Sequence, residues 1–294
     1  MAKTIIKLLF AAISFSILFI VSTALLPFSQ GFKELSSFGN PFVLLFILIS
    51  TAWTCFTIFF VIKHTDYSGK ILFLNLLFVL FFVQYFMTQI ETLFFGHAFI
   101  AISKLDIILL MLTGLFPLLG VTALLVKFFQ NKNIIHERKK INIKDILLKL
   151  GIIGIIYLCV YMLFGYFVAW QFEELRLFYT GSTEKLSFWE KLANNIRTNP
   201  IIFPFQILRG ILFGIAIIPI KNMVSKNKIS FIISVCLIYL CAAVVLIIPN
   251  VLFPDMVRIA HLIEMSSSML LFGIIVGNIL WNRNDCKLKG EIGR

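Results

Sequence analysis

The stretch IIFPFQILRGILFGIAIIPI (residues 201–220) is apolar along almost its whole length, yet Arg209 lies near its middle. A helix of about 20 apolar residues can cross the hydrocarbon core of a membrane. An arginine at that depth needs a partner or a water-filled cavity, because removing a guanidinium from water is costly. The stretch therefore predicts a transmembrane helix that contributes to a buried polar site.

The whole chain has the composition of a membrane protein. Apolar residues make up 60% of its 294 residues and charged residues 14%, whereas soluble proteins contain about 25% charged residues. Eight segments are apolar and long enough to cross a membrane: 6–26, 42–62, 71–96, 107–127, 148–170, 201–220, 229–249 and 258–281. We therefore expect an all-α fold, a polytopic transmembrane helix bundle of eight spans that forms one integral membrane domain over residues 1–294.

The lysines and arginines predict how this bundle is oriented, because cytoplasmic loops are enriched in both. With the N-terminus inside, the cytoplasmic segments contain 18 of these residues and the opposite loops contain 7. Both termini are therefore expected to be cytoplasmic, and the protein is expected in a cell membrane, with the bacterial cytoplasmic membrane favoured. The first span is longer than the apolar region of a signal peptide, which is about 7–15 residues, so a retained anchor is favoured over a cleaved signal.

The formal net charge of +12 does not indicate a nucleic-acid partner. Basic loops of a polytopic protein are explained more simply by topology, and no basic surface segment with interleaved aromatic residues occurs. The lipid bilayer is the partner that the sequence supports, together with a possible small solute or lipid ligand. The sequence identifies no cofactor and no oligomeric state.

The loop of residues 171–200 is too long for a simple turn, and it is expected on the extracytoplasmic side. Ser187 and Glu190 have the spacing of a capping box, in which the two side chains satisfy each other's backbone N–H groups at a helix start. Apolar residues recur nearby at helical spacing: Leu186, Trp189, Leu192 and Ile196. We expect an amphipathic helix at the membrane interface, which acts as a structural belt or lid, or admits a lipid-like substrate.

Polar residues on three spans share helical faces, so they are candidates for one site. Residues four and seven apart lie on the same side of a helix, and polar faces in a membrane turn toward the bundle interior. The resulting candidate site comprises Gln84, Glu91, Gln206, Arg209, His261, Glu264 and Ser268. Arg209 is expected to pair with Glu91 or with Glu264.

Two interpretations of this site stay open at the level of sequence. It could be a set of hydrogen bonds and ion pairs that specifies helix packing, or a functional site, because ionisable residues at membrane depth commonly serve a pathway or a reaction. A metal site formed by His261, Glu264 and Glu91, which His97 could approach, is the weaker possibility. A hydrogen-bonded histidine with no ligand role is favoured over it.

Glycines and prolines predict local packing. The pairs Gly210/Gly214 and Gly273/Gly277 allow close helix contacts, and if their two helices packed together they would bring Arg209 toward His261. Pro117 is expected to kink the fourth span, and Pro219 is expected to end the sixth.

Four segments of the chain resemble an uncharacterised family of bacterial polytopic membrane proteins. They are YFMTQIETLFF (85–95), GYFVAWQFEELRLFYTG (165–181), PFQILRG (204–210) and RIAHLIEMSSSMLLFG (258–273). The resemblance implies a multi-pass membrane protein but carries no known activity, so no catalytic residue can be transferred from it.

These observations support three functions. The favoured one is binding or transport of a small solute or lipid in a polar cavity that opens away from the cytoplasm, where Arg209 would bind an anionic group. The first alternative is an intramembrane enzyme acting on a lipid or lipid-linked substrate, with Glu264 or Glu91 as general base and His261 as acid. The second alternative is a non-catalytic membrane subunit or sensor.

Overall fold

The computed structural model describes the whole chain except residues 36–40, 66, 97–101, 132–141, 226 and 282–294. The described part is helical and contains no strand. Eight of its helical segments are long and apolar enough to span a membrane. Each begins and ends within a few residues of a predicted span, so the predicted all-α bundle of eight spans is confirmed.

The spans are built from ten α-helices and three short connecting turns among the described residues. Besides the last span, five spans contain one helix or one helix with a terminal turn: α1 (Ala2–Leu25), α3 (Pro41–His64), α8 (Ile143–Phe167) with η3 (Ala169–Gln171), α11 (Ile202–Met223) and α12 (Lys228–Val244) with η4 (Val245–Ile247). The third span joins α4 (Gly69–Phe81), the π-helical turn η1 (Phe82–Phe86) and α5 (Met87–Phe94). The fourth joins α6 (Lys104–Thr113) and α7 (Leu115–Phe129), and the last is α13 (Asp255–Leu280).

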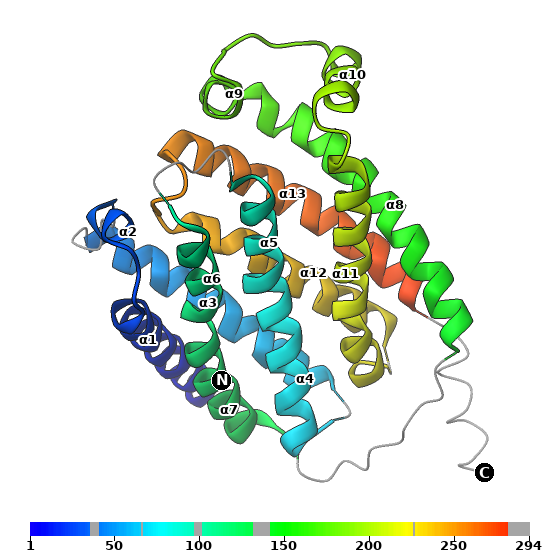
Figure 1. Cartoon of the computed structure of the whole chain (residues 1–294). Coiled ribbons are helices and arrows are strands. Elements are labelled where there is room, and N and C mark those ends of the chain that lie inside the picture. The colour runs from blue at the N-terminus through cyan, green and yellow to red at the C-terminus, as the bar shows by residue number, and fades with distance from the viewer. Residues whose placement is uncertain (36–40, 66, 97–101, 132–141, 226, 282–294) are drawn as a thin grey trace.

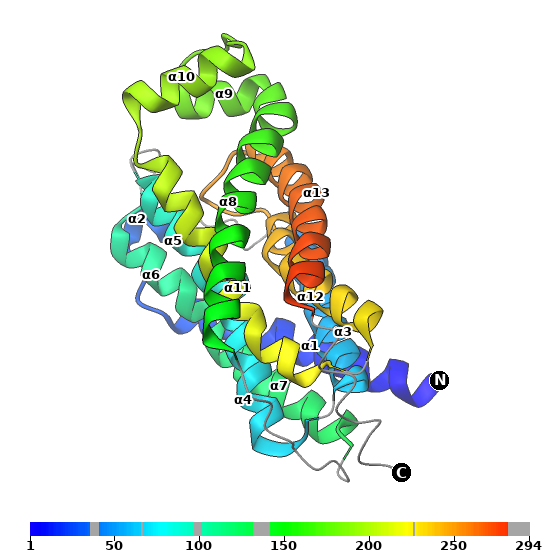
Figure 2. The same ribbon diagram turned by 90° about the vertical axis from the view of Figure 1, so that its right-hand side faces the viewer.

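Three shorter helices lie at the end of the bundle opposite the N-terminus (Figures 1 and 2): α2 (Gln30–Leu35), α9 (Glu173–Thr180) and α10 (Phe188–Thr198). Helix α10 begins at the predicted capping box, because Ser187 and Glu190 each bond the other's backbone N–H. The predicted helix of the 171–200 loop is thus present. Helix α9 precedes it and is not indicated by the sequence pattern.

The glycine pairs mediate close helix packing, but with partners other than each other. A side chain at Gly210 would meet Tyr157 Cβ at 2.5 Å and Gly154 Cα at 2.8 Å, so α11 lies directly against α8. Gly273 has the same relation to Cys236 of α12. The proposed role of these glycines in joining the sixth and eighth spans is therefore not what the structure shows: α8 packs on α11, and α12 packs on α13.

Pro117 and Pro219 affect their spans differently. The fourth span breaks at Gly114, between α6 and α7. Pro117 lies three residues later, and a proline has no N–H to donate to the carbonyl four residues earlier, which here is that of Thr113. The prediction that Pro219 ends the sixth span is wrong, because α11 continues through it to Met223. Neighbouring helices in a membrane bundle can support a helix at a proline.

Replacement of Gly210 by alanine tests the α8–α11 contact. The added methyl group would overlap backbone and Tyr157, so we expect Gly210→Ala to lower the free energy of unfolding by about 1–3 kcal/mol. Gly151→Ala is the matched control, because an added Cβ there meets nothing within 4 Å. Thermal unfolding in detergent checks both variants; equal midpoints would contradict the contact.

Candidate functional site

A two-pronged ion pair between α5 and α11 forms the centre of the buried polar site. Arg209 donates through Nη1 to Glu91 Oε1 and through Nη2 to Glu91 Oε2, each at 2.6 Å. The arginine side chain is 1% exposed and the glutamate side chain 25% exposed. Of the two partners considered for Arg209, the structure therefore selects Glu91. Paired hydrogen bonds between charged groups are the strongest that side chains make.

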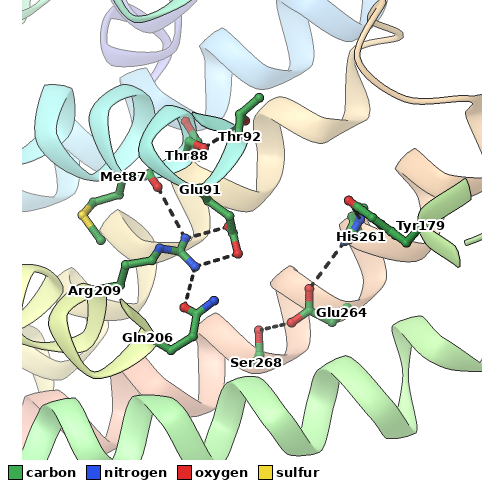
Figure 3. A network of polar contacts seen from close by, with 10 residues as sticks. All are labelled: Met87, Thr88, Glu91, Thr92, Tyr179, Gln206, Arg209, His261, Glu264 and Ser268. Atoms are coloured by element: carbon green, nitrogen blue, oxygen red, sulfur yellow. Dashed lines mark hydrogen bonds and ion pairs between the residues drawn. The ribbon is translucent and has the colours of Figure 1, made fainter. Parts of the chain in front are cut away.

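The remaining contacts of Arg209 hold the guanidinium in place (Figure 3). Its Nη1 also donates to Gln206 Oε1 at 2.9 Å, and its Nη2 approaches the Met87 carbonyl oxygen at 3.4 Å. The guanidinium carbon lies 5.5 Å from the centroid of the Tyr157 ring, within the range of a cation–π attraction. Both Nη nitrogens of Arg209 are thus hydrogen-bonded to other groups of the protein.

A second polar cluster joins α13 to α9. His261 Nε2 is hydrogen-bonded to the Tyr179 hydroxyl at 3.0 Å, while His261 Nδ1 lies 3.9 Å from Glu264 Oε2. The Ser268 hydroxyl donates to Glu264 Oε1 at 3.3 Å. Figure 3 shows this cluster apart from the Arg209–Glu91 pair. Glu264 lies on the side of α13 that faces this pair. The three site residues predicted on the last span, His261, Glu264 and Ser268, therefore lie in one cluster.

Tyr179 connects the second cluster electrostatically to the first. Burial raises the pKa of the Tyr179 phenol well above its usual value, and the negative charges of Glu91 and Glu264 raise it further. Tyr179 therefore stays protonated near neutral pH, and its hydroxyl can donate to His261. The sequence gives no indication of Tyr179, because it lies on a helix outside the spans and far from His261 along the chain.

Gln84 belongs to the site in a different way from Glu91. It lies in the π-helical turn η1, and its amide exchanges hydrogen bonds of 3.3–3.4 Å with Thr54 of α3. A π turn adds a residue to the helical turn and shifts the phase of the residues that come after it. The prediction that Gln84 and Glu91 share one face assumed a regular α-helix, and the π-helical turn changes that spacing. Gln84 bonds to α3, whereas Glu91 bonds to α11.

The two clusters border one cavity of about 770 Å³. Its polar wall includes five of the seven predicted site residues: Gln84, Glu91, His261, Glu264 and Ser268. Gln206 and Arg209 are absent from the lining and lie behind Glu91. Aromatic side chains supply much of the remaining wall, among them Phe94, Phe95, Tyr157, Tyr161 and Trp170. The cavity is thus mostly apolar, with a small polar region.

A metal ion at the three suggested ligands is not supported by the geometry. Within the described part of the chain, no group of three histidine, cysteine or acidic side chains is placed to hold a metal. Both oxygens of Glu91 are already bonded to Arg209, and the positive charge of the guanidinium disfavours a metal cation beside them. His97, the further candidate, lies outside the described residues.

Helix α10 forms part of the cavity wall, although none of its residues is buried. Lys191 lies over the Trp170 ring, with Nζ 3.6 Å from the ring centroid, and its partial burial lowers its pKa to about 8. Trp189 is 73% exposed. The helix therefore presents Lys191 to the cavity and Trp189 away from the bundle.

Arg176 holds the chain that leads into this helix. Its Nε donates to the Thr183 carbonyl at 2.7 Å, and its Nη1 donates to the carbonyls of Trp170 and Gln171. Arg258 of α13 has a comparable role: its Nη1 donates to the carbonyls of Leu246 and Ile247. Both arginines satisfy carbonyl groups at helix ends, a role that the sequence does not reveal.

Comparison with protein-family models, with curated proteins and with solved structures finds no match for this chain. The resemblance to a family of bacterial membrane proteins therefore stays a prediction. What the site can do has to be argued from its geometry.

Removal of one member of the ion pair should destabilise the protein more than removal of both. Glu91→Leu leaves a fully buried guanidinium without its carboxylate, and we expect a loss of about 3–5 kcal/mol. Arg209→Met should cost less, because Glu91 is partly exposed to the cavity and can be hydrated there.

The double variant Glu91→Leu/Arg209→Met is the control, and it should recover most of the loss seen in Glu91→Leu. Thermal unfolding in one detergent compares the three variants with the wild type. Additive losses in the double variant would show that the two side chains do not stabilise the bundle as a pair.

Proposed function

We propose that this protein binds a small solute or a lipid in the cavity between α5, α8 and α13, and transports it. The cavity volume of about 770 Å³ carries the proposal, because ligand sites usually enclose about 300–1,000 Å³ and combine apolar walls with a few polar groups. We further propose that the protein resides in the bacterial cytoplasmic membrane with both termini inside, as its basic loops suggest.

The position of α10 supports a route into the cavity. Its residues Lys191, Asn195 and Thr198 belong to the lining, while the helix buries none of its residues in the bundle. Such an element can separate from the rest of the protein at little cost. A ligand would then pass α10 at the membrane interface.

The geometry also assigns different tasks to the buried charges. Arg209 holds Glu91 and does not line the cavity, so we propose a positioning role for it in place of direct contact with an anion. Glu91, Glu264 and His261 line the cavity and are available to a ligand.

An intramembrane enzyme is the second candidate, and the Tyr179–His261–Glu264 cluster favours it. A histidine between a phenol and a carboxylate can act as a general acid or base on a substrate in the cavity. This function predicts turnover of a lipid or lipid-linked substrate that is lost in His261→Ala and Glu264→Gln. A transporter would show no chemical change in its ligand.

Filling the cavity tests the proposed binding function. A side chain added at Gly165 of α8 would enter the cavity, because Gly165 belongs to its lining and a Cβ there meets nothing within 4 Å. We expect native mass spectrometry of the wild type, released from mild detergent, to show a retained ligand mass that Gly165→Trp loses.

Gly151→Trp is the matched control on the same helix, with equal space at its Cβ but no place in the lining. It should retain the ligand mass. A wild-type protein without any retained or exchangeable mass, or a mass that Gly165→Trp keeps, would contradict binding in this cavity and favour a subunit or sensor whose buried charges serve packing.

Cysteine labelling tests the proposed orientation. Asn194→Cys on α10 should react with a membrane-impermeant maleimide in intact cells, because α10 is expected on the outside. Lys144→Cys at the start of α8 should react only after permeabilisation. The reverse pattern would overturn the orientation and leave the binding proposal intact.

A further inference from the structure

We infer that the cavity selects an organic cation, a ligand with a positively charged nitrogen or an equivalent group on an apolar body. This inference rests on the proposed binding function and specifies the class of ligand. Its basis is the carboxylate of Glu264, which has no permanent cation as a partner among the described contacts, and the aromatic walls.

The two carboxylates of the cavity lining are balanced differently. Among the described lining residues, the ionisable side chains besides tyrosine and His261 are Glu91, Glu264 and Lys191. Glu91 is neutralised from behind by Arg209, whose outer nitrogens are both bonded to it. Lys191 lies over the Trp170 ring and forms no ion pair with Glu264 among the described contacts, so the field next to Glu264 is negative.

Glu264 has no permanent cation as a partner within the described contacts. It is 12% exposed, and it accepts one hydrogen bond of 3.3 Å, from Ser268. His261 Nδ1 lies 3.9 Å away and can offset the charge only when the imidazole is protonated. A carboxylate in such surroundings is stabilised by a cation that brings donors to its free lone pairs.

The aromatic walls also favour a cation. Tyr157, Tyr161 and Tyr179 line the cavity together with Phe94 and Phe95. Ring faces attract cations within about 6 Å, and the attraction grows when water is excluded. The same rings offer apolar surface to the ligand's body. An anion would face these rings and the negative charge of Glu264.

Lys191 carries a positive charge that opposes the negative field next to Glu264. It belongs to α10, where it lies against Trp170. Its pKa of about 8 means that it is only partly charged at slightly basic pH. A measurement at that pH therefore weakens the positive charge of Lys191, which competes with a bound cation for Glu264.

Tetraphenylphosphonium and tetraphenylborate provide a matched pair of probes, because they are similar in size and hydrophobicity and opposite in charge. We would measure their binding at slightly basic pH to the full-length protein in phosphatidylcholine nanodiscs, with empty nanodiscs subtracted. The wild type should bind the phosphonium at least tenfold more tightly than the borate. Glu264→Gln should lose at least tenfold in phosphonium affinity.

Two controls separate charge from folding. Glu264→Asp keeps the charge and should keep most of the phosphonium binding, and Glu184→Gln removes an exposed carboxylate outside the lining and should bind as the wild type does. Preference for the borate, or phosphonium binding unchanged in folded Glu264→Gln, would overturn the cation inference. So would the absence of phosphonium binding to the wild type.

Failure of this inference is distinguishable from failure of the proposed function. Borate binding that Gly165→Trp abolishes would leave the cavity as a ligand site and reverse only the charge of its ligand. Absence of both ions and of any retained mass would remove both proposals. If the inference holds, the retained mass identifies the source of the positive nitrogen: an amino lipid of the host membrane or a free organic amine.

Discussion

The burial of Arg209 is the constraint on which the rest of the site depends. A guanidinium that is 1% exposed has to be neutralised inside the protein. Glu91 does so with two hydrogen bonds of equal length, and this ties α5 to α11 at one relative position. The carboxylate is thereby held at the cavity wall with its charge cancelled. The pair shapes the cavity without adding net charge to it.

Helices α8 and α13, which form another part of the cavity wall, are held by close contacts at glycines. Close backbone contact at Gly210 fixes α8 on α11, and close contact at Gly273 fixes α13 on α12. The cavity lies between these two units and is bordered toward the end opposite the N-terminus by α9 and α10. Arg176 secures the chain to α9 through three carbonyl groups, whereas α10 buries no residue. The cavity wall is therefore firmly packed where α8 and α13 form it, and loosely held where α10 forms it.

The sequence predicts the bundle well, because each span must satisfy its backbone internally and therefore appears as a long apolar segment. It also predicts that Arg209 needs an acidic partner. It could not choose between Glu91 and Glu264, since depth along a helix does not reveal which helices are neighbours. The π turn at Phe82–Phe86, the Tyr179–His261 bond and the aromatic walls of the cavity escaped prediction for the same reason. Each depends on contacts between distant segments, and periodicity in one sequence records only local faces.

The most direct test of the cavity as a ligand site is an electron cryo-microscopy map of the protein in lipid nanodiscs made from its own host membrane. We predict ligand density in the cavity beside Glu264 and the tyrosine rings, with Arg209 still bonded to both oxygens of Glu91. A cavity closed by side chains would contradict ligand binding. A map in which Arg209 leaves Glu91 and contacts an anionic ligand would contradict both the positioning role of the pair and the charge assigned to the site.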